Sequence, residues 1–146
     1  MVLKIFKALW FLSLLGFMVV FMYIYANLPQ RVVFGQGVDA AGLSRNTVFY
    51  LVLGVVALVN VLTFVVSRFY GSRNEPFSSW FFGQVMVLNF FFCTVLGYFD
   101  VLNSGERFDF QRIGIVIYGS IFLMVAWAIG WPVYTLSRKI VNKRTI

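Results

Sequence analysis

The chain of 146 residues contains no histidine, a single cysteine and only five acidic residues. Without histidine, haem ligation through an imidazole and a Ser-His-Asp triad are both excluded. One cysteine, Cys93, allows no intramolecular disulfide. Because the usual acid–base and metal-binding groups are scarce, we predict that the protein is not an enzyme and holds no cofactor or metal.

Charged residues make up only 12% of the chain, whereas 61% of the residues are hydrophobic. An ordinary soluble domain is about 25% charged. The hydrophobic residues form four blocks without Asp, Glu, His or Arg, at 5–28, 47–66, 80–99 and 113–136. Each block is long enough for a helix across about 30 Å of hydrocarbon, which needs roughly 20 apolar residues. The sequence therefore predicts an all-α membrane protein with one domain over 1–146.

The expected transmembrane helices lie at 5–28, 47–68, 78–100 and 112–137. Since short loops connect them, we predict a four-helix antiparallel bundle. Eight basic residues then lie on the side of the two termini and four on the other side. The positive-inside rule places both termini in the cytoplasm, in what we expect to be a bacterial inner membrane.

The net charge of +7 follows this membrane arrangement, so no nucleic-acid partner is expected. The carboxyl-terminal tail is the most basic segment. We expect it to contact anionic lipid, each basic residue near the surface contributing about 1 kcal/mol. The tail alone does not imply a specific lipid site. Its basic residues are Arg138, Lys139, Lys143 and Arg144.

A few polar residues inside the spans indicate a face between the second and third helices. Asn60 and Thr63 share a face of the second helix, as Asn89 and Cys93 do on the third. Antiparallel packing brings Asn60 and Asn89 to within roughly 5 Å along the axis, where they could hydrogen-bond. We interpret these residues as interhelical polar contacts, worth about 0.6 kcal/mol on average. The alternative is a polar lining for a small-molecule path.

Small residues and one proline mark the fourth helix. Ala126 and Gly130 are four residues apart, a spacing that favours close helix packing. Pro132 has no backbone N–H to donate, so we predict a kink near the inner end of this helix.

Asp100 is the only carboxylate next to a hydrophobic span. Our interpretation is a paired interfacial charge facing Arg31, Arg45 or Arg112, and the alternative is a proton-linked site.

The loops on the far side from the termini carry weaker signals. Ser44 is a candidate N-cap for the second helix, and 32–34 is a candidate extended piece. Aromatic and polar residues alternate over 107–112, which is strand-like. We favour interfacial aromatics beside an N-capping Asp109 over a small outer cap.

Together these features favour a non-catalytic accessory or scaffold subunit of a larger inner-membrane assembly of the translocation, secretion or respiratory type. Its expected partners are membrane lipids and other membrane-protein subunits. The alternative function is a small oligomeric transporter or channel with a polar path between the second and third helices.

Overall fold

The structure is a computed structural model that describes residues 2–35, 40–70, 74–105 and 110–143, without the side chains at 70, 110–112, 139 and 141–143. Four of its helices are long and apolar enough to cross a membrane, in agreement with the predicted class. Two short strands accompany them. The elements are α1 (Val2–Asn27), β1 (Arg31–Val33), β2 (Gly42–Ser44), α2 (Arg45–Tyr70), α3 (Glu75–Asn103) and α4 (Phe110–Lys143).

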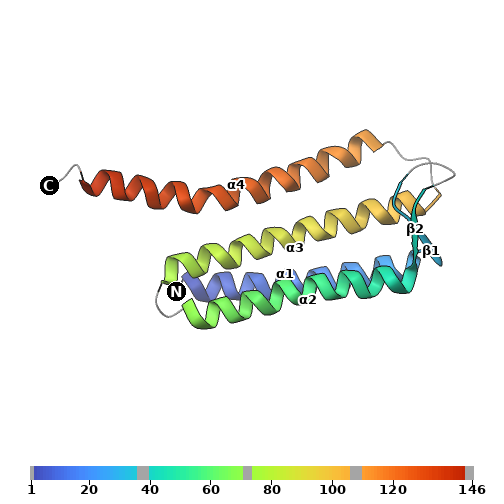
Figure 1. Ribbon diagram of the computed structural model, residues 1–146, viewed down its shortest axis with the longest axis horizontal. Coiled ribbons are helices and arrows are strands. Elements are labelled where there is room, and N and C mark those ends of the chain that lie inside the picture. Colours follow the sequence, from blue (N-terminus) through green and yellow to red (C-terminus); the bar gives the residue numbers. More distant parts are fainter. Residues whose placement is uncertain (1, 36–39, 71–73, 106–109, 144–146) are drawn as a thin grey trace.

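The helices lie side by side along the long axis, and successive helices run in opposite directions (Figure 1). The strands mark one end, which we call the sheet end. Both termini lie toward the other end, which we call the terminal end. Helix α3 is central, because α1, α2 and α4 each pack against it. Helix α4 packs mainly on α3, so its opposite side is left uncovered within the chain.

Local side chains fix the beginnings of two helices. The Ser44 hydroxyl accepts a hydrogen bond from the backbone N–H of Thr47 at 3.1 Å, which confirms the predicted N-cap of α2. Asn74 caps α3 in the same way, since its side chain accepts from the N–H of Phe77 at 3.2 Å. At the other end of α3, Gly105 has a φ of 74°, a left-handed conformation that favours glycine.

The predicted extended piece is present as β1, which pairs with β2 in antiparallel register. Asn103, at the end of α3, ties this hairpin to the helices. Its Oδ1 accepts from the N–H of Val33 at 2.8 Å, and its Nδ2 donates to the carbonyl of the same residue at 3.1 Å. At the second loop of this end, 110–112 belong to α4 and not to a strand. Asp109 lies outside the described residues, so its capping role stays a prediction.

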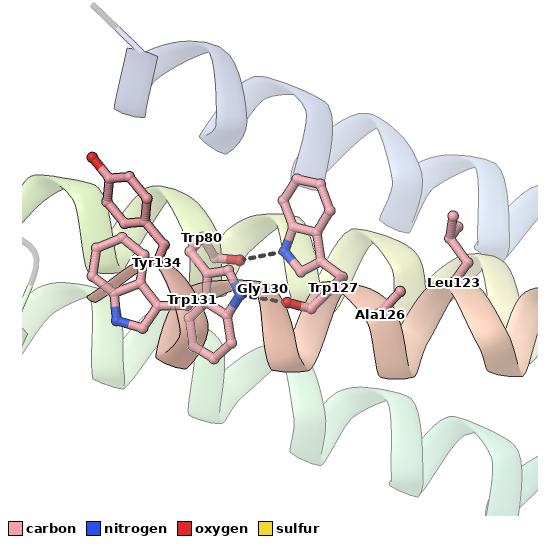
Figure 2. A pocket seen from close by; sticks show the side chains of 7 residues that line it. All are labelled: Trp80, Leu123, Ala126, Trp127, Gly130, Trp131 and Tyr134. Carbon is pink, nitrogen blue, oxygen red and sulfur yellow. Dashed lines mark hydrogen bonds between the residues drawn. The ribbon is translucent and has the colours of Figure 1, made fainter. Parts of the chain in front are cut away.

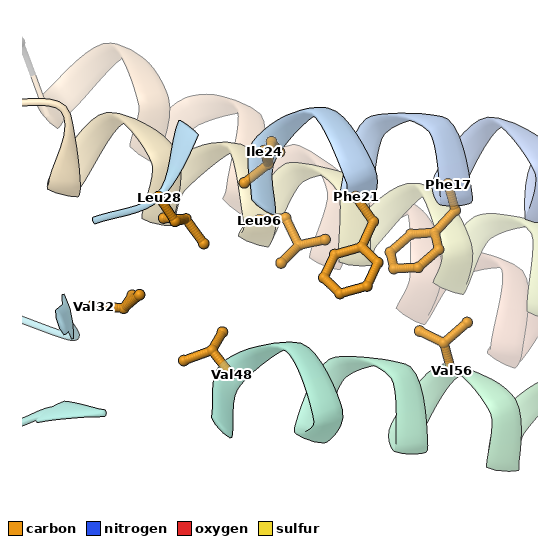
Figure 3. Close-up of a cluster of buried hydrophobic side chains, with 8 residues drawn as sticks. All are labelled: Phe17, Phe21, Ile24, Leu28, Val32, Val48, Val56 and Leu96. Atoms are coloured by element: carbon orange, nitrogen blue, oxygen red, sulfur yellow. The ribbon is translucent and has the colours of Figure 1, made fainter. Parts of the chain in front are cut away.

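The hydrophobic core lies near the sheet end, between α1, α2, α3 and β1 (Figure 3). Phe17 and Phe21 are each 1% exposed and form a stacked ring pair. Val32 of β1 is completely buried, so the strand closes this end of the core. The remaining side chains of this core cluster are Ile24, Leu28, Val48, Val56 and Leu96. Phe82, Val85 and Val87 of α3 are buried outside the cluster.

Replacing Asn103 with alanine should release β1 from α3. Two backbone groups of Val33 lose their partners, and the expected cost is about 2 kcal/mol of unfolding free energy. Asn46→Ala is the control, because Asn46 only accepts an exposed hydrogen bond from Tyr25. Thermal or SDS unfolding in mild detergent measures both variants, and equal stability of the two would contradict the anchoring role.

Candidate functional site

Polar groups in the middle of the helices form one layer that is centred on α1. The indole Nε1 of Trp10 donates to Asn60 Oδ1 at 2.8 Å, and Asn89 Nδ2 donates to the Ser13 hydroxyl at 3.0 Å. Asn60 also donates to the carbonyl of Val56 in its own helix. The described contacts do not include the direct bond between Asn60 and Asn89 that the sequence allowed, and α1 supplies a partner to each amide.

The other two residues of the predicted polar face have less prominent contacts. Thr63 is 1% exposed, and its hydroxyl donates to the carbonyl of Val59 in the same helix. Cys93 is half-buried and packs against the hydrophobic core. Asn89 Oδ1 is buried and has no hydrogen-bond donor within the described part of the chain. This layer can hold helices together, and it contains no ionisable group.

Asp100 has no ion-pair partner among the residues whose side chains are described. Arg45, one of the three partners considered, donates instead to the carbonyl of Leu28 at 3.3 Å and lies over the ring of Tyr25. The side chain of Arg112 lies outside the described residues, so a pairing of Asp100 with Arg112 stays a prediction.

A reciprocal pair of tryptophans joins α3 to α4 (Figure 2). Trp80 Nε1 donates to the carbonyl of Trp127 at 2.8 Å, and Trp127 Nε1 donates to the carbonyl of Trp80 at 3.0 Å. We call this pair the tryptophan clasp. Beside it, Gln84 Nε2 donates to the carbonyl of Met124 at 3.4 Å. In lipid, where no water competes, such bonds fix the register of the two helices.

Gly83 makes the clasp possible, since the ring of Trp127 lies directly on it and would overlap a Cβ at this position. Neither the clasp nor the role of Gly83 is predicted from the sequence. The only signal was a glycine on the third helix within a turn of Trp80, and it does not point to a residue 44 positions further along the chain.

A cavity of about 420 Å³ opens beside the clasp and extends along α4 from Leu123 to Tyr134. Its wall is aromatic and includes Trp80, Trp131 and Tyr134 (Figure 2). The predicted packing residues Ala126 and Gly130 form another part of the wall, with Leu123 and Trp127. Arg138 lies at its edge, with the guanidinium carbon 5.3 Å from the ring centre of Tyr134.

Three further cavities have mainly apolar linings. One lies between α2 and α3 with a volume of about 180 Å³, and one of about 390 Å³ lies between α3 and α4 near the sheet end. The third, of about 410 Å³, is lined by α1, α3 and Leu123 of α4. Asn60, Thr63 and Asn89 line none of these four cavities.

Gly119, Ala126 and Gly130 of α4 do not bring another described helix close. No atom lies within 4 Å of a Cβ built at Gly119 or Gly130, and Ala126 is exposed. Their packing role is therefore not fulfilled by the described helices. Pro132 lies inside α4, which continues to Lys143 rather than ending near 137; the predicted kink stays a prediction.

The basic tail begins inside the same helix. Arg138 is exposed at the edge of the cavity, whereas the side chains of Lys139 and Lys143 and the whole of Arg144 lie outside the described residues. Over the part of the chain that is described, no three His, Cys, Asp or Glu residues are grouped in a way that could hold a metal ion.

Comparison of the chain with protein-family models, with curated proteins and with solved structures found no match.

Replacing Gly83 with alanine should loosen α4. The new methyl group takes the space of the Trp127 ring, and overpacking of this kind costs about 1–3 kcal/mol. Gly54→Ala on α2 is the control, because nothing lies within 4 Å of a Cβ there. Thermal unfolding in detergent measures the loss of stability. Adding Trp127→Phe to Gly83→Ala should restore little of that stability, since the smaller ring relieves the overlap but cannot form the hydrogen bonds of the clasp.

Proposed function

We propose that the protein is a non-catalytic, integral membrane subunit that binds other membrane proteins through α4. Three observations about α4 support this role. It packs mainly on α3, and its far side is rich in large apolar residues. Only 6% of its most apolar stretch of 18 residues is buried within the chain, against 11% for α1 and 22% for α2 and for α3. We call that side the outer face; it includes Ile115, Tyr118, Gly119, Phe122 and Ile129.

The observation that carries the proposal is the open glycine in the middle of this face. Lipid also covers exposed apolar side chains, so exposure alone does not distinguish lipid from a partner. Gly119 adds almost no apolar surface toward lipid, but it lets the backbone of another helix approach closely. It lies beside Ile115 and Phe122, which are 74% and 75% exposed and could pack around such a helix.

The location follows the charge distribution. We place both termini in the cytoplasm of a bacterial inner membrane, because the sequence has eight basic residues in the segments on the side of the termini and four in the segments on the other side. In this orientation the basic end of α4 faces the leaflet that is richer in anionic lipid.

The small oligomeric transporter has less support. Its path would need Asn60 and Asn89 to face a common opening, whereas both amides are buried and bond to α1. An oligomeric transporter would be recognised in a cross-linking experiment by an adduct between two copies of this chain.

A photo-cross-linking residue at Phe122 should give one discrete protein adduct in the native membrane, because the outer face contacts a partner helix. The control is the same residue at Val61, an exposed position of α2, which should cross-link to lipid only. Gly119→Leu should abolish the adduct at 122, since the larger side chain blocks close approach, and Gly54→Leu should keep it.

Mass spectrometry of the adduct then separates the alternatives. A different membrane protein as the partner agrees with the subunit role. A second copy of this chain would favour the oligomeric transporter. Lipid adducts alone at 122 would refute the proposal.

A further inference from the structure

The cavity beside the tryptophan clasp has unused hydrogen-bond donors at its edge. Three of the four tryptophans, Trp10, Trp80 and Trp127, donate their indole N–H to an acceptor in the chain. Over the described part of the chain, the indole N–H of Trp131 has no acceptor, and the hydroxyl of Tyr134 has no hydrogen-bond partner. Both side chains line the cavity.

A positive charge lies at the same edge. Arg138 follows Trp131 and Tyr134 at helical spacings of seven and four residues, so the three side chains share one face of α4. Stacking on Tyr134 holds the guanidinium there. Among the described residues Arg138 has no acidic partner. The edge thus offers an N–H, an O–H and a cation, a set of groups that suits a phosphate.

The rest of the cavity is apolar and continues along α4 away from Arg138, through Gly130 and Ala126 to Leu123. At Gly130 the missing side chain leaves open space, with no atom within 4 Å of a Cβ position. A hydrocarbon chain fits such a wall, whereas a free phosphate would leave it uncovered. A cationic headgroup would be repelled by Arg138 and by the basic residues that follow it.

We propose that this cavity is a binding site for one anionic phospholipid. An acyl chain lies against Ala126 and Gly130, the phosphate accepts from Arg138 and Tyr134, and Trp131 donates to another oxygen of the same headgroup region. The tryptophan clasp holds the two walls in register, so the site forms within one chain and does not depend on the proposed partner of α4.

The test uses the full chain in phosphatidylcholine vesicles that contain a small fraction of a brominated phospholipid, because bromine quenches tryptophan fluorescence on contact. Brominated phosphatidylglycerol should quench the tryptophan fluorescence at a much lower mole fraction than brominated phosphatidylcholine does, and the ratio of the two mole fractions measures the preference for anionic lipid. Arg138→Gln should reduce this preference about fivefold, the factor that corresponds to one basic residue at about 1 kcal/mol. Arg68→Gln, a basic residue at the same end but on α2, should change it by less than about twofold.

Two glycine variants separate a built site from general attraction to the basic tail. Gly130→Leu keeps every charge but fills the cavity, so it should lose most of the preference. Gly119→Leu, at an equally open glycine outside the cavity, should keep it.

Three results would overturn the proposal. The first is an unchanged preference in Gly130→Leu, which would mean surface attraction only. The second is an equal effect of Arg138→Gln and Arg68→Gln. The third is displacement of the quenching lipid by soluble glycerol phosphate, which would mean that the site takes the phosphate alone. Loss of the cross-link at 122 with an intact lipid preference would affect only the proposed subunit role.

Discussion

The structure depends on one constraint, which is that hydrocarbon offers no hydrogen-bond partner to a polar group. Most of the buried polar side chains of the spans therefore have partners on neighbouring helices or in their own backbone, with Ser78 Oγ and Asn89 Oδ1 among the exceptions. Helix α3 takes part in most of the interhelical bonds: Asn89 binds α1, Trp80 and Gln84 bind α4, and Asn103 binds β1. These bonds hold α1 and α4 to α3, whereas α2 is hydrogen-bonded to α1 and packs against α3 through apolar side chains.

The same arrangement leaves the helices unequal. Helices α1, α2 and α3 share a core near the sheet end, whereas α4 is held to α3 by the tryptophan clasp and by a contact between Thr94 and Ser120. The outer face of α4 is consequently open to a partner, and its end near Arg138 borders an aromatic cavity. The proposed subunit role and the proposed lipid site use two different stretches of one helix, around Gly119 and around Gly130.

The sequence was sufficient for the class of protein, for the positions of the four long helices and for the cap at Ser44, because these features depend on local composition and spacing. It also pointed to Asn60 and Asn89 as buried polar residues. The sequence did not identify the partners of these two amides, since both partners are on α1 and the position of α1 beside α2 and α3 is set by packing. Gly83 and Trp127 were missed for the same reason: their contact joins helices through packing, and neither residue carries a local pattern that indicates the other.

The most direct test of a central α3 is disulfide trapping in the native membrane, with Cys93 replaced by serine. Cysteines at Thr94 and Ser120, whose hydroxyl oxygens are 3.1 Å apart, should cross-link rapidly. Cysteines at Val55 of α2 and at Ser120 should not, although Val55 lies across a cavity from Val95 and so at a similar depth to Thr94. Cross-linking of the second pair, or of neither pair, would contradict the placement of α4 on α3.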